Sequence, residues 1–505
     1  MKDRIYRVFG THRLGRLWSV YVPYALGIGS NAGLNIVLIS LLTHRLAPAV
    51  YGDYSVSLTA IVLASAVIGQ WLQQSTGRYL AGCRARASYY TKAAVLLGVG
   101  GILLSLAIVY ALVAIFALPD YAANAELWSI TIVAVAAQTL LTVVGATLQS
   151  EQRAWPYALQ QTCVGSLKIV LSLLACFVTQ RGIGDLLRAC AMAQCIGVAF
   201  GGWQAGLFDR RVLAMLKSRR AWLVLRKLFA YGGAMTLWFV FMNLAMYCDR
   251  LLVRDIAGSA TAGLYGAAST LVVGSVNLVM APVLAATWPQ LMAAWNVRNE
   301  QVAARLLGNL LTALLCAGIA VVAIVGAVAE PATRLFLGEK FIAATPLLPL
   351  LTASAFSFSM GPFFHKPLEF KQMKSTMCVF AVCALLLNGT LSMVITPWLG
   401  GFGAGLAALL AGSTYCALCA LFGRKIVRWQ IQFDLLGAVA VVGGVASIAV
   451  NRLSASWHFD SNLLKFVATG GGFIVVFGAG LAVVISLTIP NVAARKSGRL
   501  SKFDE

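Results

Sequence analysis

The chain has 505 residues, of which 60% are hydrophobic and only 11% charged, and its formal net charge is +22. A soluble domain carries about 25% charged residues, so the composition excludes an ordinary soluble protein and indicates an integral membrane protein. The positive charge does not indicate nucleic-acid binding, because cytoplasmic loops of membrane proteins collect Lys and Arg and no basic surface domain is evident.

Apolar stretches of about 20 residues, the length that crosses a bilayer, follow one another along the whole chain. We therefore expect an all-α polytopic membrane protein with about 14 transmembrane helices. The stretches are 17–42, 54–75, 93–118, 126–148, 158–179, 187–207, 229–251, 265–287, 304–329, 345–363, 376–396, 404–422, 435–451 and 464–489. The ends of the fifth, sixth and thirteenth are the least sharply marked. Fourteen spans place both termini on the same side.

Lys and Arg are distributed unequally over the segments that join these stretches. The segments on the side of the termini hold 29 of them, and the opposite segments hold 9. Since positive residues stay inside, we expect both termini in the cytoplasm. The longest connecting segment, Phe208–Leu228, is basic and amphipathic, and we expect it to lie on the inner leaflet.

An internal repeat divides the chain. Asp249–Ser269 resembles Leu38–Leu58 at an offset of 211, which aligns Gly263-x-Tyr265 with Gly52-x-Tyr54. Repeats that match more in hydropathy than in identity are typical of duplicated transporter halves. We therefore expect two six-helix lobes related by the repeat and two further C-terminal helices. The expected units are an N-terminal lobe at 1–228, a C-terminal lobe at 229–423, and the last two spans with a basic tail at 424–505.

Enzyme signatures are not found. The sequence has no His-x-x-x-His pair, no Gly-x-Ser-x-Gly elbow and no phosphate loop, and its carboxylates are scattered. The outside loops are short, which leaves no room for a catalytic domain there. Nearly all of the eleven cysteines lie in apolar segments, so we expect no disulfides. We also expect no metal site and no cofactor.

Lys168 lies near the middle of the fifth stretch. Insertion scales give such a charge a cost of about 2.5–3.5 kcal/mol, so we expect Lys168 to face a cavity. The alternative is a buried pair with a carboxylate such as Asp249 or Glu126.

Other polar side chains gather in several spans of the first half and, in the second half, near the start of the repeat. Asn31 and Asn35, for example, are four residues apart and share a helical face. Hydrogen bonding between helices is the alternative for the neutral groups. Because the spans contain cations and neutral polar groups but few acids, a cavity that they line would suit an anion. The full set of candidates for a substrate cavity is Lys168, Arg78, Asn31, Asn35, Gln70, Gln138, Asn243, Arg250 and Arg254.

Several motifs, in this order and spacing, resemble lipid-linked oligosaccharide flippases of the Wzx type. These belong to the multidrug/oligosaccharidyl-lipid/polysaccharide exporter superfamily. The resemblance covers about residues 15–425. The motifs are Leu46–Tyr54, similar to the first outside loop; Gly77–Ala81, similar to the end of the second span; Asp249–Val253, Gly258 and Ala262–Tyr265, similar to the start of the second lobe; and Leu335–Phe341 with Ala344–Pro349, similar to the loop before the tenth span.

The resemblance implies two lobes around a cationic cavity. It implies alternating access that moves an undecaprenyl-pyrophosphate-linked oligosaccharide from the cytoplasmic to the outer leaflet of a bacterial inner membrane. The product would be a surface polysaccharide, such as O-antigen, capsule or exopolysaccharide. Implied partners besides the bilayer are a polysaccharide polymerase and a chain-length regulator. Coupling to H⁺ or Na⁺ is left open, with Asp249 as the candidate residue.

Two alternatives stay open. The first is export of drugs or other small molecules, since drug exporters belong to the same superfamily. These tend to carry an acid in the first or seventh span, whereas this sequence has none at 17–42 and only Asp249 at the far end of the seventh. The second is a membrane-embedded polysaccharide polymerase or ligase, which the short outside loops disfavour.

Overall fold

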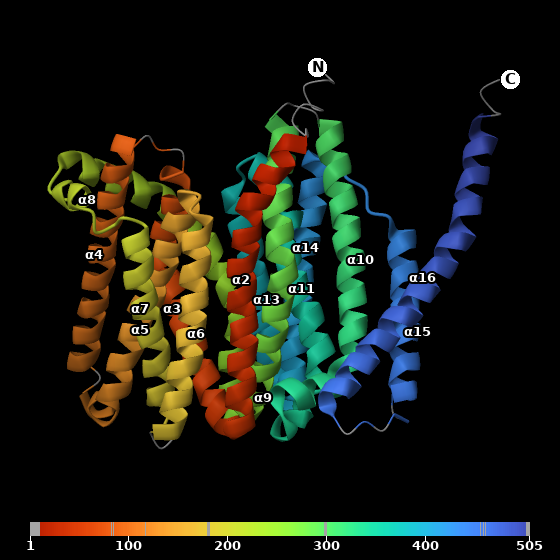
Figure 1. Ribbon diagram of the computed structural model, residues 1–505, viewed down its shortest axis with the longest axis horizontal. Coiled ribbons are helices and arrows are strands. Elements are labelled where there is room, and N and C mark those ends of the chain that lie inside the picture. The colour runs from red at the N-terminus through yellow and green to blue at the C-terminus, as the bar shows by residue number, and fades with distance from the viewer. Residues whose placement is uncertain are drawn as a thin grey trace.

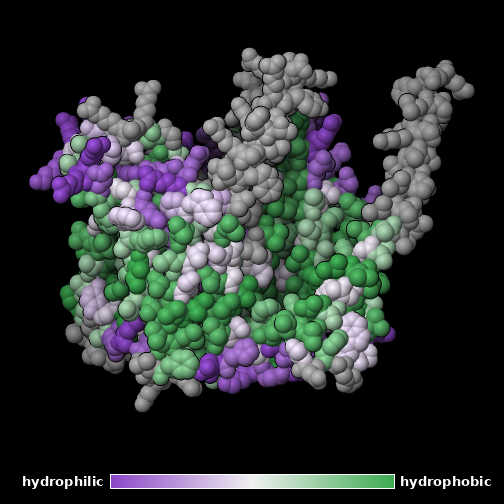
Figure 2. Space-filling view, in the orientation of Figure 1, coloured by the Kyte–Doolittle hydropathy of each residue, from purple (hydrophilic) through white to green (hydrophobic). Residues whose placement is uncertain are grey.

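The computed structural model describes residues 11–500, apart from 82, 84, 117, 179–181, 297–299, 455, 458 and 460, as helices joined by short turns (Figure 1). Twelve helices among these residues are long and apolar enough to cross a membrane. Apolar side chains cover a broad band across the face of the bundle that Figure 2 shows. The protein is therefore an all-α, multi-pass membrane protein, as expected.

Six long helices, coloured red to yellow-green in Figure 1, form the first lobe. They are α2 (Thr11–Arg45), α3 (Pro48–Tyr79), α4 (Ala85–Phe116), α5 (Leu118–Ser150), α6 (Ala154–Val178) and α7 (Ile183–Gln204). Within the lobe α2 packs on α6, α3 packs on α5, and both α5 and α6 pack on α7. The short α8 (Arg210–Ala214) follows at one end of the bundle, which we call the α8 face.

The next element, α9 (Arg219–Asn296), is a helical hairpin that breaks at Gly258, where φ is 84° and ψ is 166°. Arg250 Nη2 donates a 2.8 Å hydrogen bond to Ser269 Oγ across the hairpin. In an unbroken helix these residues, 19 apart, would be separated by about 28 Å. The two halves of α9 therefore run in opposite directions, and we call the end of the bundle at Gly258 the hairpin face.

The second lobe consists of the two halves of α9 with α10 (Glu300–Ala332), α11 (Leu347–Phe364), the short α12 (Lys366–Phe370), α13 (Lys374–Leu399) and α14 (Gly401–Ile426). Its packing repeats that of the first lobe, since α13 and α11 pack on α9, and both pack on α14. Two six-helix lobes of matching arrangement are thus present, as the sequence repeat predicts. The break in α9 and the additional long α2 make the number of spans compatible with fourteen.

The turns that lead into α6 and α13 also repeat. Gln152 and Gln372 both have φ of 55°. The next amide in each turn, that of Arg153 or Met373, donates a 2.9 Å hydrogen bond to the carbonyl five residues back. This is the Schellman motif that ends a helix, and it occurs at corresponding places in the two lobes.

The last two helices, α15 (Phe433–Ser454) and α16 (Asn462–Leu500), pack beside the second lobe against α10. α2 begins and α16 ends at the α8 face (Figure 1), which agrees with an even number of spans. Between α10 and α11 lie a π-helical turn, η1 (Thr333–Leu337), and a 3₁₀ turn, η2 (Glu339–Ala344), joined at Gly338.

The predicted outside loop at Leu46–Tyr54 is wrong in its length. Pro48 stands at the start of α3, where its fixed φ suits a first helical position, so Gly52 and Tyr54 already lie inside the helix. Gly263 and Tyr265 likewise lie inside the second half of α9. The repeated Gly-x-Tyr therefore provides helix surface and not loop.

Candidate functional site

A cavity of about 340 Å³ lies between the lobes, where α2 and α3 of the first lobe face both halves of α9. Its polar lining consists of Asn35, Ser55, Thr59, Thr270 and Arg250, and the other lining residues are apolar residues and tyrosines. Thr59 and Thr270 are equivalent positions of the repeat, which thus places one threonine from each half in the cavity. The position equivalent to Arg250 in the first half is Ile39, and among the described residues that line the cavity Arg250 is the one cation.

Neutral groups hold the Arg250 guanidinium. Besides the hydrogen bond to Ser269, Nη1 donates to Thr59 Oγ1 at 3.5 Å, and the group lies 5.3 Å from the centre of the Tyr247 ring. In the described ranges no carboxylate forms an ion pair with it. A guanidinium without an acidic partner, facing a cavity, can form charge-assisted hydrogen bonds with an anion.

Asp249, the candidate for ion coupling, is 3% exposed and lies beside the cavity without lining it. One carboxylate oxygen accepts a hydrogen bond from the Tyr265 hydroxyl, and the other accepts one from the Arg250 amide at 2.8 Å. Both oxygens are thus used inside the α9 hairpin, where the side chain joins its two halves.

The lobes meet closely at the hairpin face of the cavity. Asp53 Oδ1 accepts hydrogen bonds from Arg254 Nε and Ser259 Oγ, each at 2.8 Å. The ring of Tyr51 contacts that of Phe341 in η2 edge to face, with centroids 5.9 Å apart. These contacts close the cavity toward the hairpin face in this structure.

Two asparagines predicted for the cavity lie at the joint between α2 and α6. Asn31 Nδ2 donates to Gln161 Oε1 at 2.8 Å, and Asn35 Nδ2 donates to Asn31 Oδ1 at 3.0 Å. Asn35 also lines the cavity, whereas Asn31 does not. The chain of amides therefore continues from the cavity into the first lobe.

The other polar candidates are not brought to this cavity. Gln138 accepts a 2.5 Å hydrogen bond from Gln194 inside the first lobe, and Asn243 donates to the Phe239 carbonyl of its own helix. Arg78 is exposed and lies over the Tyr231 ring, 4.4 Å from its centre. Gln70 lies on α3 outside the cavity lining, and Arg254 belongs to the contact at the hairpin face.

Lys168 is the fifteenth of the 25 residues of α6, so it lies at mid-depth, and it is half-buried. It is seven residues beyond Gln161, which places both on one side of the helix, the side facing α2. It does not line the 340 Å³ cavity. The carboxylates named as alternative partners are engaged elsewhere, Asp249 with Tyr265 and Glu126 with Arg188.

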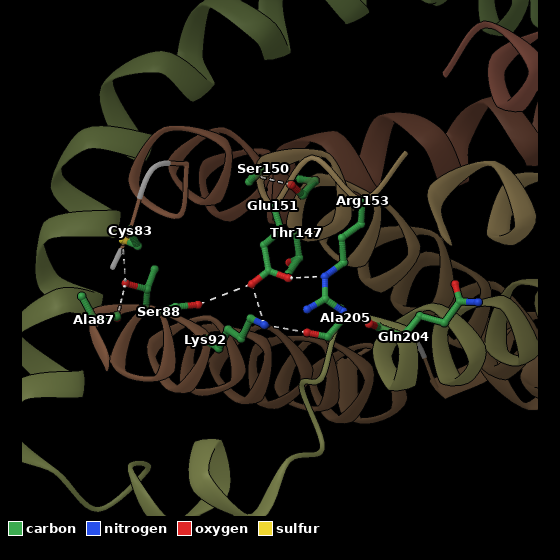
Figure 3. Close-up of polar contacts among 12 residues, drawn as sticks. Cys83, Ala87, Ser88, Lys92, Thr147, Ser150, Glu151, Arg153, Gln204 and Ala205 are labelled. Carbon is green, nitrogen blue, oxygen red and sulfur yellow. Dashed lines mark hydrogen bonds and ion pairs between the residues drawn. The ribbon is translucent and has the colours of Figure 1, made fainter. Parts of the chain in front are cut away.

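A separate charged network lies at the α8 face of the first lobe (Figure 3). Lys92 Nζ is 2.6 Å from Glu151 Oε1 and donates to the Ala205 carbonyl at 2.7 Å, and Arg153 Nε is 3.1 Å from Glu151 Oε2. This network ties α4 to the α5–α6 turn and to the end of α7. Since Glu151 neutralises part of its charge and the groups bond to one another, we assign it a structural role.

Several residues of the site were not selected from the sequence: Asp53, Thr59, Tyr247, Ser259 and Ser269. One signal was available. Asp53 stands inside the repeated Gly-x-Tyr, and its counterpart in the second half is Leu264. An acid that only one half of a repeat carries indicates a specific partner, here Arg254.

The fold is that of membrane transporters with two lobes. A lipid II flippase, MurJ, in an inward closed conformation is 13% identical, with a TM-score of 0.67 over 94% of this chain and 99% of that chain. A multidrug resistance transporter of the MATE family, in an inward-facing conformation, is 16% identical, with a TM-score of 0.59 over 80% of this chain and 97% of that chain. A multidrug resistance transporter of the MATE family in an outward-facing conformation is also 16% identical, with a TM-score of 0.55 over 80% of this chain and 94% of that chain.

The sequence itself matches the family described as polysaccharide biosynthesis protein, over residues 20–295. This range is more than half of the chain, and the protein belongs to that family. The resemblance carried by the motifs is thereby confirmed. The comparison with curated proteins found no match.

Proposed function

We propose that the protein flips a lipid-linked oligosaccharide, carried on undecaprenyl pyrophosphate, from the cytoplasmic to the outer leaflet of a bacterial inner membrane. Membership of the polysaccharide biosynthesis family supports the proposal, and so does a fold shared with a lipid II flippase. The positive residues concentrated on one set of loops support a cytoplasmic α8 face.

The observation that carries the proposal is Arg250, a cation in the cavity between the lobes whose described partners are neutral hydroxyls and a ring. A pyrophosphate group cannot cross hydrocarbon without losing its hydration, which is costly for a charged group. Arg250 would replace part of that hydration with charge-assisted hydrogen bonds. Asn35 and the two threonines would meet neutral polar groups of the substrate.

The same lining disfavours export of cationic drugs. Asp249, which precedes Arg250 in the chain, is buried, and both of its oxygens are used within the α9 hairpin. A cationic molecule would therefore meet Arg250, and no carboxylate is among the described residues that line the cavity. The membrane potential also favours outward movement of an anionic head, by about 2.3 kcal/mol per charge per 100 mV.

Transport requires the cavity to open alternately to the two faces. In this structure it is closed at the hairpin face by Asp53, Arg254 and Ser259. Release on that side would require these contacts to part. The polyprenyl tail would remain in lipid beside the lobes while the head group crosses.

The test uses protein in liposomes that contain a fluorescent undecaprenyl-pyrophosphate oligosaccharide, whose appearance in the opposite leaflet is measured by a quencher. We expect Arg250→Ala to slow transfer roughly tenfold or more, the effect of a lost charged hydrogen bond. Arg250→Lys should keep part of the rate. Arg305→Ala, on the exposed start of α10, serves as the control. Wild-type transfer equal to that of empty liposomes, together with drug export, would overturn the proposal.

A further inference from the structure

A second hollow, of about 980 Å³, lies at the α8 face of the first lobe. Its walls are α3 and α4, and its roof is the segment Phe208–Leu228, which contains α8 and the first turns of α9. We call this segment the connector. None of the residues that line this hollow lines the 340 Å³ cavity between the lobes, which we call the central cavity. The hollow is therefore separate from the proposed transport route.

Two glycines without side chains leave open space in the wall that α4 provides. Gly100 and Gly101 both line the hollow, and a Cβ atom added to either would meet nothing within 4 Å. The adjoining lining is apolar, with Leu104 63% and Trp222 56% exposed. A space of this size with apolar walls falls within the range of sites that hold small apolar ligands.

The roof also carries positive charge, although Arg226 is its single charged residue among those that line the hollow. Its seven cations are Arg210, Arg211, Lys217, Arg219, Arg220, Arg226 and Lys227. Its one acid, Asp209, accepts a hydrogen bond from the Arg211 amide at 2.9 Å, and no ion pair joins the seven to any acid of the described residues. Arg226 itself lines the hollow.

Several contacts hold the connector, which forms the roof, against α4. Arg211 Nη1 donates to the Tyr89 hydroxyl at 3.3 Å, and Arg220 lies over the Tyr90 ring, 5.8 Å from its centre. Val212 and Ala221 are fully buried against α4. The network of Figure 3 holds the Ala205 carbonyl just before the connector. The shape of the hollow is thus maintained by specific contacts within the first lobe.

We propose that this hollow binds an anionic phospholipid of the leaflet at the α8 face. The acyl chains would lie along Gly100, Gly101 and the apolar walls. The phosphate would lie at the level of Arg226 and the other connector cations, each of which attracts an anionic headgroup. A phospholipid fits better than the polyprenyl carrier, because the hollow has no lining residue in common with the central cavity.

The bound lipid acts on the helix that carries Arg250. Phe229, which lines the hollow, and Arg250 belong to the same unbroken half of α9. Gly232 on this half packs against the backbone of Trp71, whose side chain also lines the hollow. Occupation therefore stabilises the position of this half of α9 against α3, and with it one arrangement of the lobes.

The experiment measures lipid retention by native mass spectrometry of protein taken from nanodiscs of phosphatidylglycerol and phosphatidylcholine. We expect one phosphatidylglycerol to be retained in preference. Gly101→Leu, which fills the hollow, should abolish its retention, and Arg226→Gln should weaken it roughly fivefold. The controls are Gly389→Leu, at an open position of α13, and Arg452→Gln at the end of α15.

Three results would overturn the proposal. Equal retention in all variants would mean that only a surrounding lipid annulus is seen. Displacement of phosphatidylglycerol by added undecaprenyl phosphate would identify the carrier as the occupant. Binding of glycerol phosphate as tight as that of the lipid would show that the apolar hollow is not used. Because the readout is retention and not transfer, a failure here leaves the proposed transport function untouched.

Discussion

Gly52 and Gly263 lie face to face where the lobes meet at the hairpin face. A Cβ atom on Gly52 would collide with the Ser259 carbonyl and lie 2.8 Å from the Gly263 amide nitrogen. A Cβ atom on Gly263 would collide with the Pro48 carbonyl and lie 3.1 Å from the Gly52 nitrogen. The two glycines are equivalent positions of the repeat, and so are Pro48 and Ser259. This contact therefore has the two-fold symmetry of the repeat.

We predict that Gly52→Ala or Gly263→Ala prevents full closure at the hairpin face. A methyl group against a backbone carbonyl costs about 1–3 kcal/mol if the lobes stay together, which would shift the equilibrium toward the open state by roughly fivefold or more. Spin labels at Ala47 and Glu339 in a cysteine-free protein would measure the separation. Transfer should slow while protein abundance stays normal.

The matched controls are Gly77→Ala on α3 and Gly274→Ala on the second half of α9, where a Cβ atom would meet nothing within 4 Å. Both should leave the distance distribution unchanged. A closed distance distribution in Gly52→Ala, equal to that of the wild type, would show that the lobes do not need these glycines in order to close.

The ion pair between Asp53 and Arg254 should stabilise the closed contact between the lobes only weakly. The Arg254 side chain is 46% and that of Asp53 30% exposed, and exposed pairs contribute about 0.2–1 kcal/mol. We expect Arg254→Ala to raise the open population only a few-fold. Reversing both charges, in Asp53→Arg with Arg254→Asp, should restore closure that either reversal alone disturbs. No recovery in the double variant would argue against a direct pair.

Hydropathy and charge were enough to predict the helices and the repeat, because a bilayer demands long apolar spans whatever their neighbours. Helix ends were predicted less well. Leu46–Tyr54 contains a proline, a glycine and an aspartate, which are typical of a loop, but Pro48 begins α3 and Gly52 provides close packing. The packing partner of Gly52, the Ser259 carbonyl, belongs to the other half of the chain and leaves no local signal.

The residues of the site were also only partly predictable from local sequence. Arg250 was among the candidates because it is a cation near the start of the repeat in the second half, and it does line the cavity. Gln138 has the same polar character but faces Gln194 within the first lobe, since the direction of a side chain on a helix depends on which helices pack around it. Composition indicates that polar groups are present in spans, but only the packing decides which of them share a cavity.

The orientation of the protein can be tested with reporter fusions. We predict that a fusion at Ser218, in the connector, reports the cytoplasm and that one at Asp120, near the start of α5, reports the opposite side. The reason is the excess of Lys and Arg on the side of the α8 face. Alkaline phosphatase activity at Ser218 would reverse the proposed direction of transport.

Lys168 remains a candidate for contact with the pyrophosphate when the lobes open, since it lies at mid-depth on the α2-facing side of α6. We predict that Lys168→Ala reduces polymer export at normal protein abundance and that Lys168→Arg retains much of it, because the charge is kept. A structural pair would instead lower abundance in Lys168→Ala, since a carboxylate would be left buried. Normal export by Lys168→Ala would exclude both roles.

The last prediction concerns a buried ionic network near the α8 face of the second lobe. Lys366 is 2% exposed, and its Nζ lies 3.0 Å from Glu369 Oε2. His365 Nε2 lies 2.8 Å from the other oxygen of Glu369, and its Nδ1 lies 2.9 Å from the Tyr415 hydroxyl. The network thus joins α11, α12 and α14.

Glu369→Gln should lower the free energy of unfolding by about 3–5 kcal/mol, because the Lys366 ammonium stays buried without that carboxylate. Adding Lys366→Met should recover most of the loss, since an apolar side chain of similar length removes the buried charge. The control Glu339→Gln breaks an exposed contact with Arg334 and should cost at most about 1 kcal/mol. Thermal unfolding in detergent measures all three variants. Equal losses for Glu369→Gln and Glu339→Gln would mean that water reaches Lys366 and that the network does not stabilise the lobe.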